Sequence, residues 1–298
     1  MVRALTFWLR PDFLVRCLRR FQTLEGFDRA IALASLTFSA LIPLGIVVSG
    51  AVSDHSIGQH LVERYGLEGN GAEAVKDLFD TGADLASSFS VFSFFLLLVT
   101  ILSFSRAIQR LFERAWELPP LSVRNTKNGL IWMCGLVVYA VATGVVRANY
   151  NSGVLELLTG AVLGLLSVAF VVWSGVLLSN RRITRHQLLP AAILVAAVGG
   201  LLAIGGDIYV PRLFNSYASR YGAVGAVFAL ISWLFVLMVG LVAAVAVGRE
   251  VSEELDAIGR GEKPSNEQIQ AEWAQVRRQA HEARERVAGW RAARKAKR

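Results

Sequence analysis

The sequence predicts an all-α integral membrane protein with six transmembrane helices, interfacial amphipathic helices, a basic helical tail at the C-terminus and both termini in the cytoplasm. Of 298 residues, 54% are hydrophobic and only 18% are charged, whereas soluble domains carry about 25% charged residues. The hydrophobic residues form long blocks, and the Lys and Arg residues gather in alternate connections between the blocks. These observations together indicate helices that cross a bilayer in a defined orientation.

Six blocks are long enough to cross a hydrocarbon core, which takes about 20 helical residues. Inside lipid each block must be helical, because every backbone N–H and C=O needs an internal partner. The second block is short and rich in serine, so its ends are the least sharply defined. The expected spans are Ala30–Val52, Ser88–Ser105, Gly129–Val146, Val154–Leu178, Leu188–Ile208 and Val224–Val247.

The distribution of positive charge sets the orientation. The N-terminal segment, the second and fourth connections and the C-terminal segment carry 26 of the 31 Lys and Arg residues. Because cytoplasmic loops retain positive charge, these four segments face the cytoplasm of a bacterial inner membrane. The chain then divides into a cytoplasmic basic amphipathic segment (residues 1–29), a six-span membrane domain (30–250) and a cytoplasmic basic helical tail (251–298).

Three segments outside the spans carry amphipathic patterns. The acidic extracytoplasmic connection 53–87 reads as a helical hairpin over the outer end of the bundle, with a plain solvated loop as the alternative. Residues Leu5–Phe21 and Arg106–Ala115 each place apolar residues at helical spacing beside arginines. We expect both basic segments to lie against anionic membrane lipids.

The C-terminal tail keeps its apolar residues at an alternating spacing of three and four, a short and weak heptad pattern. A coiled-coil contact, a membrane-surface helix, a nucleic-acid arm and a solvated helix that only reinforces topology all fit this pattern. The sequence leaves a homo-oligomer and a cytoplasmic partner of the tail open, and predicts no specific nucleic-acid partner.

Two groups of polar residues are candidate functional sites within the membrane domain. No acidic residue lies in the middle of a span, so a proton relay or ion path has little support. The first candidate is a neutral polar seam between spans one and two, for which ordinary helix packing is the alternative. The second is a cluster at the outer surface that would form an anion site or a structural anchor. The seam comprises Ser35, Ser39, Pro43, Ser90 and Ser93, and the outer cluster comprises Asp207, Arg212 and Arg220.

The sequence contains no recognisable catalytic motif. The 4 histidines form no metal-ligand cluster, and the two cysteines, Cys17 and Cys134, read as small packing residues. No nucleophile elbow, Walker loop or dinucleotide-binding turn occurs. We therefore expect no catalytic, cofactor-binding or metal site, and a protein that is not an enzyme.

Three segments carry a resemblance to a known family. They are Ala32–Leu44 with its Ser-x-x-x-Pro-Leu end, Ser105–Arg110 followed by Ala115-Trp116, and Tyr221–Val227 followed by Trp233. In this order and spacing, over roughly residues 25 to 255, the chain resembles the YihY/BrkB family of bacterial inner-membrane proteins, and in particular its YhjD-like branch.

The resemblance implies six spans with cytoplasmic ends. It implies no established activity: the family was once labelled ribonuclease BN, an assignment regarded as mistaken, and members have been linked to export of envelope lipid or lipopolysaccharide. Many members carry a Gly-Ala-Glu-like segment in the last span, where this chain has Gly240-Leu241-Val242 and no acid. A role that depends on that carboxylate is not expected here.

The leading functional prediction is a transport-class protein that moves or exports a lipid or another envelope amphiphile. The alternative is a membrane scaffold that transports nothing and whose cytoplasmic tail recruits a partner. An enzyme, including a ribonuclease, is the third and disfavoured hypothesis.

Overall fold

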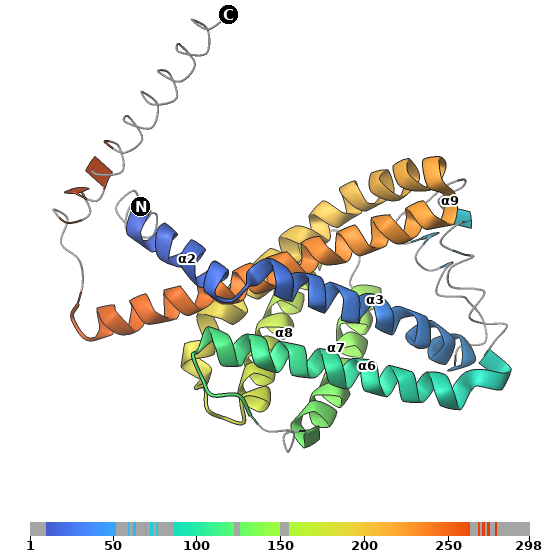
Figure 1. The fold of residues 1–298 in the computed structure, drawn as a ribbon, viewed down its shortest axis with the longest axis horizontal. Coiled ribbons are helices and arrows are strands. Elements are labelled where there is room, and N and C mark those ends of the chain that lie inside the picture. Colours follow the sequence, from blue (N-terminus) through green and yellow to red (C-terminus); the bar gives the residue numbers. More distant parts are fainter. Residues whose placement is uncertain are drawn as a thin grey trace, which may run out of the picture.

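The computed structural model describes residues 10–51, 86–121, 126–149 and 155–262, with scattered residues at 59–76 and 268–278. The side chains of residues 42–51, 86–94, 147–149, 155–158 and 223 lie outside that description. The described residues form helices and turns, with no strand among them, so the predicted all-α class is confirmed (Figure 1).

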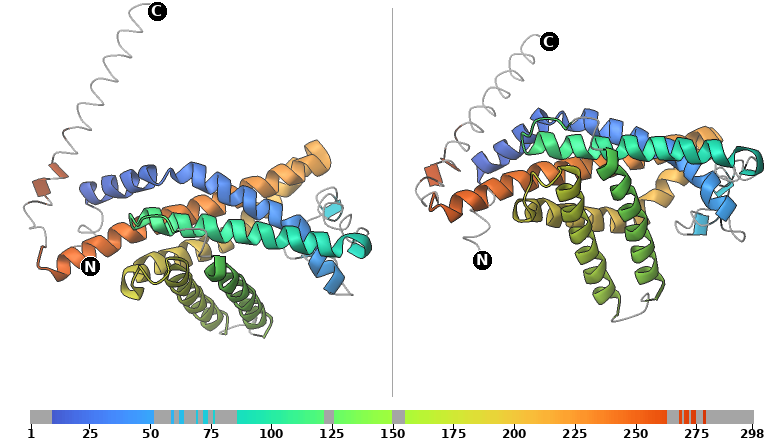
Figure 2. Two further views of the ribbon diagram at one scale, coloured as in Figure 1. Left: turned by 60° about the horizontal axis from the view of Figure 1, so that its bottom comes forward. Right: turned by 90° about the horizontal axis from the view of Figure 1, so that it is seen from below.

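Three long helices form one layer of the molecule. Helices α3 (Gly26–Ala51) and α6 (Ala86–Ala115) pack side by side, and α9 (Arg185–Gly259) packs against α3 (Figures 1 and 2). Helix α9 consists of two helices joined at Gly222, where φ is 59° and ψ is −140°. This backbone conformation is open only to glycine, and it lets the second half of α9 return alongside the first.

Helices α7 (Thr126–Asn149) and α8 (Leu155–Leu178) form a hairpin that is steeply inclined to that layer (Figure 2). Aromatic rings hold the hairpin together. Tyr139 of α7 stacks on Phe170 of α8 with ring centroids 4.4 Å apart. Gly135 faces the ring of Trp173, and any side chain at that position would overlap the ring.

Most of the described core lies at one end of the molecule. Leu111 of α6, Leu178 of α8, Leu188 and Val245 of α9 and Leu24 before α3 are at most 2% exposed. A smaller cluster surrounds the bend of α9, where Val210, Phe214 and Ala226 are buried.

The predicted extracytoplasmic segment touches this smaller cluster. Val62 and Ala72, which lie on the apolar faces expected for segment 53–87, pack against the bend of α9. Most of segment 53–87 lies outside the described residues, so the helical hairpin stays a prediction. The heptad pattern of the C-terminal tail also stays a prediction.

Five described helical stretches are long and apolar enough to span a membrane: Phe95–Ala115, Thr126–Val146, Thr159–Leu178, Arg185–Gly222 and Val224–Gly259. They correspond to predicted spans two to six. The first predicted span, Ala30–Val52, falls on the 26-residue helix α3, part of whose side chains lie outside the description. A multi-pass helical architecture is therefore confirmed.

Two predicted boundaries were wrong. The amphipathic stretch after span two is not a separate surface helix but the last turns of α6, and its apolar residues Ile108, Leu111 and Phe112 are buried in the core. The connection expected between spans five and six is helical up to the bend at Gly222.

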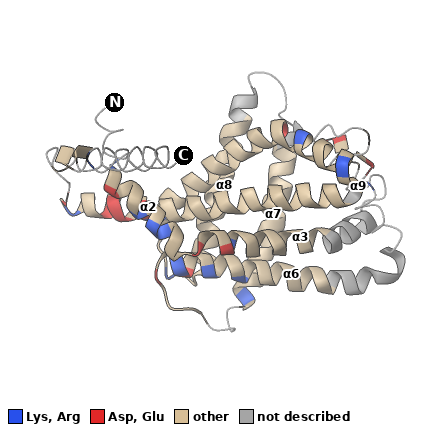
Figure 3. Cartoon of the chain, turned by 45° about the horizontal axis from the view of Figure 1, so that its top comes forward, with Lys and Arg blue, Asp and Glu red and all other residues tan. Residues whose placement is uncertain are grey.

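Charged side chains are distributed unequally along the described chain. Many of them gather around α2 (Pro11–Thr23) and the C-terminal turns of α6 and α9, which we call the arginine-rich end (Figure 3). A smaller group lies near the bend of α9, where Asp207, Arg212 and Arg220 are found. This separation agrees with the alternation of charge along the sequence.

Candidate functional site

An apolar cavity of about 610 Å³ lies between α6, α7, α8 and both halves of α9. Its lining runs along α8 from Ser174 to Gly160, a rise of about 21 Å at 1.5 Å per residue. That length is a large part of a hydrocarbon core of about 30 Å. The volume also falls in the range of about 300–1,000 Å³ that is typical of ligand pockets. The cavity therefore has the size and character of a site for a hydrocarbon chain.

The few polar groups in the cavity wall satisfy one another. The Tyr139 hydroxyl and Ser167 Oγ are 2.8 Å apart, and Trp132 Nε1 donates to Ser174 Oγ at 2.9 Å. Ser167 also donates to the carbonyl of Leu163 on its own helix. Because these partners leave little unsatisfied polarity, the wall behaves as an apolar surface with two hydrogen-bonded interruptions.

Four glycines leave the cavity open. Gly160 and Gly164 of α8 and Gly199 and Gly200 of α9 line it, and a Cβ atom added at any of them would meet no atom within 4 Å. The Gly-x-x-x-Gly spacing of Gly160 and Gly164 is common at helix contacts in membranes, but among the described residues no helix packs against these two glycines. Gly240 shows the contrast, since a Cβ there would come within 2.8 Å of Leu202. Gly160 and Gly164 of α8 therefore leave space in the cavity and do not contact another helix of the described chain.

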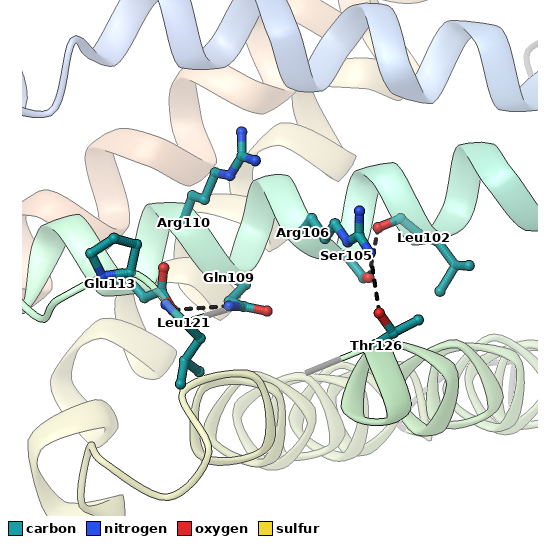
Figure 4. A pocket seen from close by; sticks show the side chains of 10 residues that line it. Leu102, Ser105, Arg106, Gln109, Arg110, Glu113, Leu121 and Thr126 are labelled. Carbon is teal, nitrogen blue, oxygen red and sulfur yellow. Dashed lines mark hydrogen bonds between the residues drawn. The ribbon is translucent and has the colours of Figure 1, made fainter. Parts of the chain in front are cut away.

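A small polar pocket of about 140 Å³ lies at the arginine-rich end of α6 (Figure 4). Glu113, which is 3% exposed, lies at one end of its lining. Glu113 Oε1 accepts hydrogen bonds from Gln109 Nε2 at 2.9 Å, from the Leu121 backbone N–H at 3.0 Å and from Arg182 at 2.9 Å. Glu113 thus fastens the end of α6 to the turn before α9.

Beside Glu113, two arginines border the same pocket. Arg106 donates to Thr126 Oγ1 at 3.1 Å, which joins α6 to the first residue of α7. Arg110 points away from the pair formed by Gln109 and Glu113 (Figure 4). Both guanidinium groups are exposed, so the pocket offers positive charge at its rim and a neutralised carboxylate inside.

Helix α2 is held to the end of α9 by buried ion pairs. Glu254 receives Arg10 and Arg16, each at 2.6 Å, and Glu250 receives Arg20 at 2.7 Å. The side chains of Arg10, Glu250 and Glu254 are at most 9% exposed. Burial alone would lower the pKa of Arg20, but the hydrogen bond to Glu250 and the charge of Glu253 raise it above its usual value.

These ion pairs show what the arginines of the basic N-terminal segment contact within the chain. Arg10, Arg16 and Arg20 pair with α9 carboxylates, and contact of this segment with anionic lipid stays a prediction. The outward side of α2 is apolar, with Leu14, Val15 and Leu18 all exposed. Arg19 is the exposed arginine of this helix.

The residues of the predicted polar seam are only partly placed. Ser35 and Ser39 are exposed on α3, and Ser39 Oγ donates to the Ser35 carbonyl at 2.9 Å. The side chains of Pro43, Ser90 and Ser93 lie outside the described residues. Neither described serine lines the apolar cavity, and the seam stays a prediction.

The predicted outer cluster lies on one helix. Asp207, Arg212 and Arg220 are all exposed on the first half of α9, ahead of the bend. Their joint role as an anion site or a structural anchor stays a prediction.

Sequence reasoning missed Glu113 and Glu250 as buried groups. Glu113 lies in a basic segment expected to lie against anionic lipid, and Glu250 is the last residue of the predicted membrane domain. A signal was present in the four-residue spacing of Gln109 and Glu113, which places their side chains on one helix face. Glu250, Glu253 and Glu254 likewise form an acidic group inside a basic region, which points to internal pairing.

Comparison with known proteins gives a consistent assignment. The family described as "Virulence factor BrkB" matches residues 17–269. Two UPF0761 membrane proteins of Stenotrophomonas maltophilia, from strains K279a and R551-3, are each 24% identical over 256 residues, which is 80% of this chain. The chain spans 59% of the length of these relatives. No solved structure matches.

The family match covers the layer, the hairpin, the apolar cavity and the arginine-rich end from residue 17 onward. It includes the three segments that carry the resemblance in the sequence, Ala32–Leu44, Ser105–Trp116 and Tyr221–Trp233. The chain therefore belongs to the BrkB family of multi-pass membrane proteins.

Proposed function

We propose that this protein handles membrane lipid, moving a phospholipid or a related envelope amphiphile between the two leaflets by way of the apolar cavity. The observation that carries the proposal is a cavity of about 610 Å³ between candidate membrane spans, kept open by glycines of α8 and α9. A cavity lined in this way accommodates a hydrocarbon chain and offers nothing to a hydrated ion.

Supporting the proposal is the arrangement of polar groups around the cavity. The arginine-rich end carries the charged pocket of Glu113, Arg106 and Arg110, where a lipid headgroup at the membrane surface would be found. We further propose six spans with both termini in the cytoplasm of a bacterial inner membrane, with α3 as the first span, and membership of the YhjD-like branch. Cysteine labelling from either side of the membrane at positions 59 and 261 tests this orientation.

The experiment that tests lipid movement measures leaflet exchange of fluorescent phospholipids in proteoliposomes that contain the purified protein. Gly164→Leu and Gly200→Leu each place a large side chain into the cavity without touching a neighbour at Cβ. The leucine would occupy space that the proposed lipid chain needs, and a barrier raised by about 1.4 kcal/mol slows a rate about tenfold. We therefore expect exchange to fall by about tenfold in these variants.

The matched control is Gly144→Leu. Gly144 lies on α7, is exposed, does not line the cavity and also has open space at its Cβ position. The control should exchange lipid at the rate of the unmodified protein. If the unmodified, folded protein exchanges lipid no faster than protein-free vesicles, the proposal of autonomous lipid movement is wrong. If Gly144→Leu loses as much exchange as the cavity variants, the apolar cavity is not the path of the lipid.

The competing hypothesis of a membrane scaffold depends on the tail beyond residue 262, most of which lies outside the described residues. No described contact favours it. We also propose that the protein is not an enzyme. What supports this is the wall of the apolar cavity, which consists of aliphatic and aromatic groups and of hydroxyl groups that are already hydrogen-bonded.

A further inference from the structure

One face of α6 carries a row of arginines at the arginine-rich end. Arg106, Arg110 and Arg114 follow one another at intervals of four residues, which aligns them along the helix. Arg29, in the first turn of α3, lies close enough for its charge to interact with Arg110 and Arg114. We call these four residues the arginine row.

The arginine row has more positive charge than its protein partners neutralise. Glu25 is the carboxylate that pairs with it, at 3.0 Å from Arg114 and 3.8 Å from Arg29. Among the described side chains, Arg110 makes no hydrogen bond or ion pair. Within the part of the chain that the structure describes, four guanidinium groups therefore share one carboxylate, and three positive charges remain.

Arg29 is partly buried within this group of like charges. Its side chain is 16% exposed. Burial lowers its pKa, and the neighbouring charges of Arg114 and Arg110 lower it further against the opposing effect of Glu25. Like charges held at such proximity repel one another, and an anion bound among them would relieve the repulsion.

The same arginines open onto a cavity of suitable size. Arg106 and Arg110 border the pocket of about 140 Å³, together with the hydroxyl groups of Ser105 and Thr126. Glu113 at the far side is already neutralised by Arg182 at 2.9 Å. Ser105 donates its hydroxyl proton to the Leu102 carbonyl at 2.9 Å. A phosphate group at the rim would therefore meet the guanidinium groups of Arg106 and Arg110 beside the Thr126 hydroxyl, and paired guanidinium groups are what arginine-rich phosphate sites use.

We propose that the arginine row and its pocket bind the phosphate of a phosphoester, and that the phosphoester is an anionic phospholipid headgroup at the membrane surface. This proposal deepens the proposed function by naming its headgroup site, and binding at the site can hold even if the protein moves no lipid. It also differs from the basic face of α2, where Arg10, Arg16 and Arg20 are paired with α9 carboxylates.

The test measures lipid binding to the full chain in detergent by native mass spectrometry, with phosphatidylglycerol and phosphatidylcholine as probes. The test variant is Arg106→Gln/Arg110→Gln, and the matched control is Arg181→Gln/Arg185→Gln. The control removes the same charge from two exposed arginines, one in the turn before α9 and one at its first residue. A charged hydrogen bond is worth about a tenfold change in affinity or more, so phosphatidylglycerol should bind the test variant about tenfold more weakly and the control normally.

A second arm distinguishes a lipid from a soluble ligand. Glycerol 3-phosphate is added at increasing concentration, and displacement of phosphatidylglycerol at millimolar concentration would assign the site to the phosphoester itself. No displacement, with tenfold weaker lipid binding in the test variant, would assign it to the intact lipid.

The proposal is overturned if phosphatidylglycerol binds the unmodified protein and the test variant with equal affinity. It is also overturned if the control variant loses as much affinity as the test variant, because the lipid would then be attracted by the overall positive charge and not by this site. Far-UV circular dichroism of both variants confirms that each is folded. Leaflet exchange measured on the same preparations separates this proposal from the proposed function, because either can fail alone.

Discussion

At the scale of single residues, the buried carboxylates carry the most structural information. Glu113 is 3% exposed and gathers three donors from α6, the turn at Leu121 and the turn before α9. A buried charge that loses its partner is costly, and here one carboxylate serves several donors at once. Glu113 therefore fixes how the end of α6 meets the start of α9.

Replacing Glu113 by Ala should lower the free energy of unfolding by about 2–3 kcal/mol, somewhat less than for a fully buried pair because Arg182 is partly exposed. The loss arises because Arg182, Gln109 and the Leu121 N–H are left without their acceptor. Unfolding in mixed micelles of increasing SDS content measures it. Glu117→Ala, at a carboxylate 76% exposed, should change stability by less than about 1 kcal/mol, and an equal effect of the two substitutions would contradict the role of Glu113.

Cys17 gives a prediction that depends on pH. Burial raises the pKa of its thiol from about 9 to about 11, and the nearby charge of Glu250 adds to the shift. Because the thiolate is the reactive form, Cys17 should react with a water-soluble maleimide far more slowly than a free cysteine at pH 7.5. Labelling followed by peptide mass spectrometry measures this rate.

The same shift sets the sign of a stability change. The folded protein holds the thiol proton more tightly than the unfolded chain, so this contribution to stability is present below pH 9 and is lost as the pH rises towards 11. Glu250→Gln removes the second cause and should bring the thiol pKa part of the way back. Fast labelling of Cys17 at pH 7.5 in the folded protein would contradict its burial under α9.

At the scale of elements, the bend of α9 decides the path of the last two spans. Gly222 adopts a φ of 59° with a ψ of −140°, and Gly225 approaches the backbone of Tyr217 so closely that a Cβ atom would overlap the Tyr217 carbonyl. The two glycines together permit a helix of 75 residues to fold back on itself instead of leaving the membrane.

Gly222→Ala should destabilise the protein by about 1–3 kcal/mol, because a side chain is strained in this region of φ and ψ. The measurement is again unfolding in SDS micelles. Gly144→Ala, at an ordinary helical position with open space, should leave stability unchanged or slightly raise it. A Gly222→Ala variant as stable as the control would show that the bend needs no glycine.

Sequence patterns predicted where the helices lie along the chain, but they did not predict where each helix ends or how it is tilted. The apolar blocks predicted spans two to six because lipid admits only helices of that length. The end of α6 was misjudged because Arg106 and Arg110 resemble the flank of a span, although no Gly or Pro interrupts the helix before Pro119. The cavity was not predictable, since whether Gly160 and Gly164 meet a helix or a void depends on the tilt of the α7–α8 hairpin, which distant contacts set.

At the scale of the whole molecule, contacts are concentrated at the arginine-rich end. The larger core cluster lies there, whereas further along the hairpin Val137, Val141 and Val145 of α7 and Leu165 of α8 are all more than 50% exposed. Exposed aliphatic residues of this kind suit contact with lipid chains. The α7–α8 hairpin therefore packs against the rest of the molecule at the arginine-rich end, and the apolar cavity lies between the hairpin and α9.

The measurement that tests the central claim most directly is photo-crosslinking with a phosphatidylcholine that carries a diazirine near the end of one acyl chain. If a lipid chain enters the apolar cavity, adducts should form on residues 163–171 of α8 and 195–204 of α9. Their yield should fall in Gly164→Leu and stay unchanged in Gly144→Leu. Adducts confined to the outward residues 137–145 of α7, with no effect of Gly164→Leu, would contradict entry of lipid into the cavity.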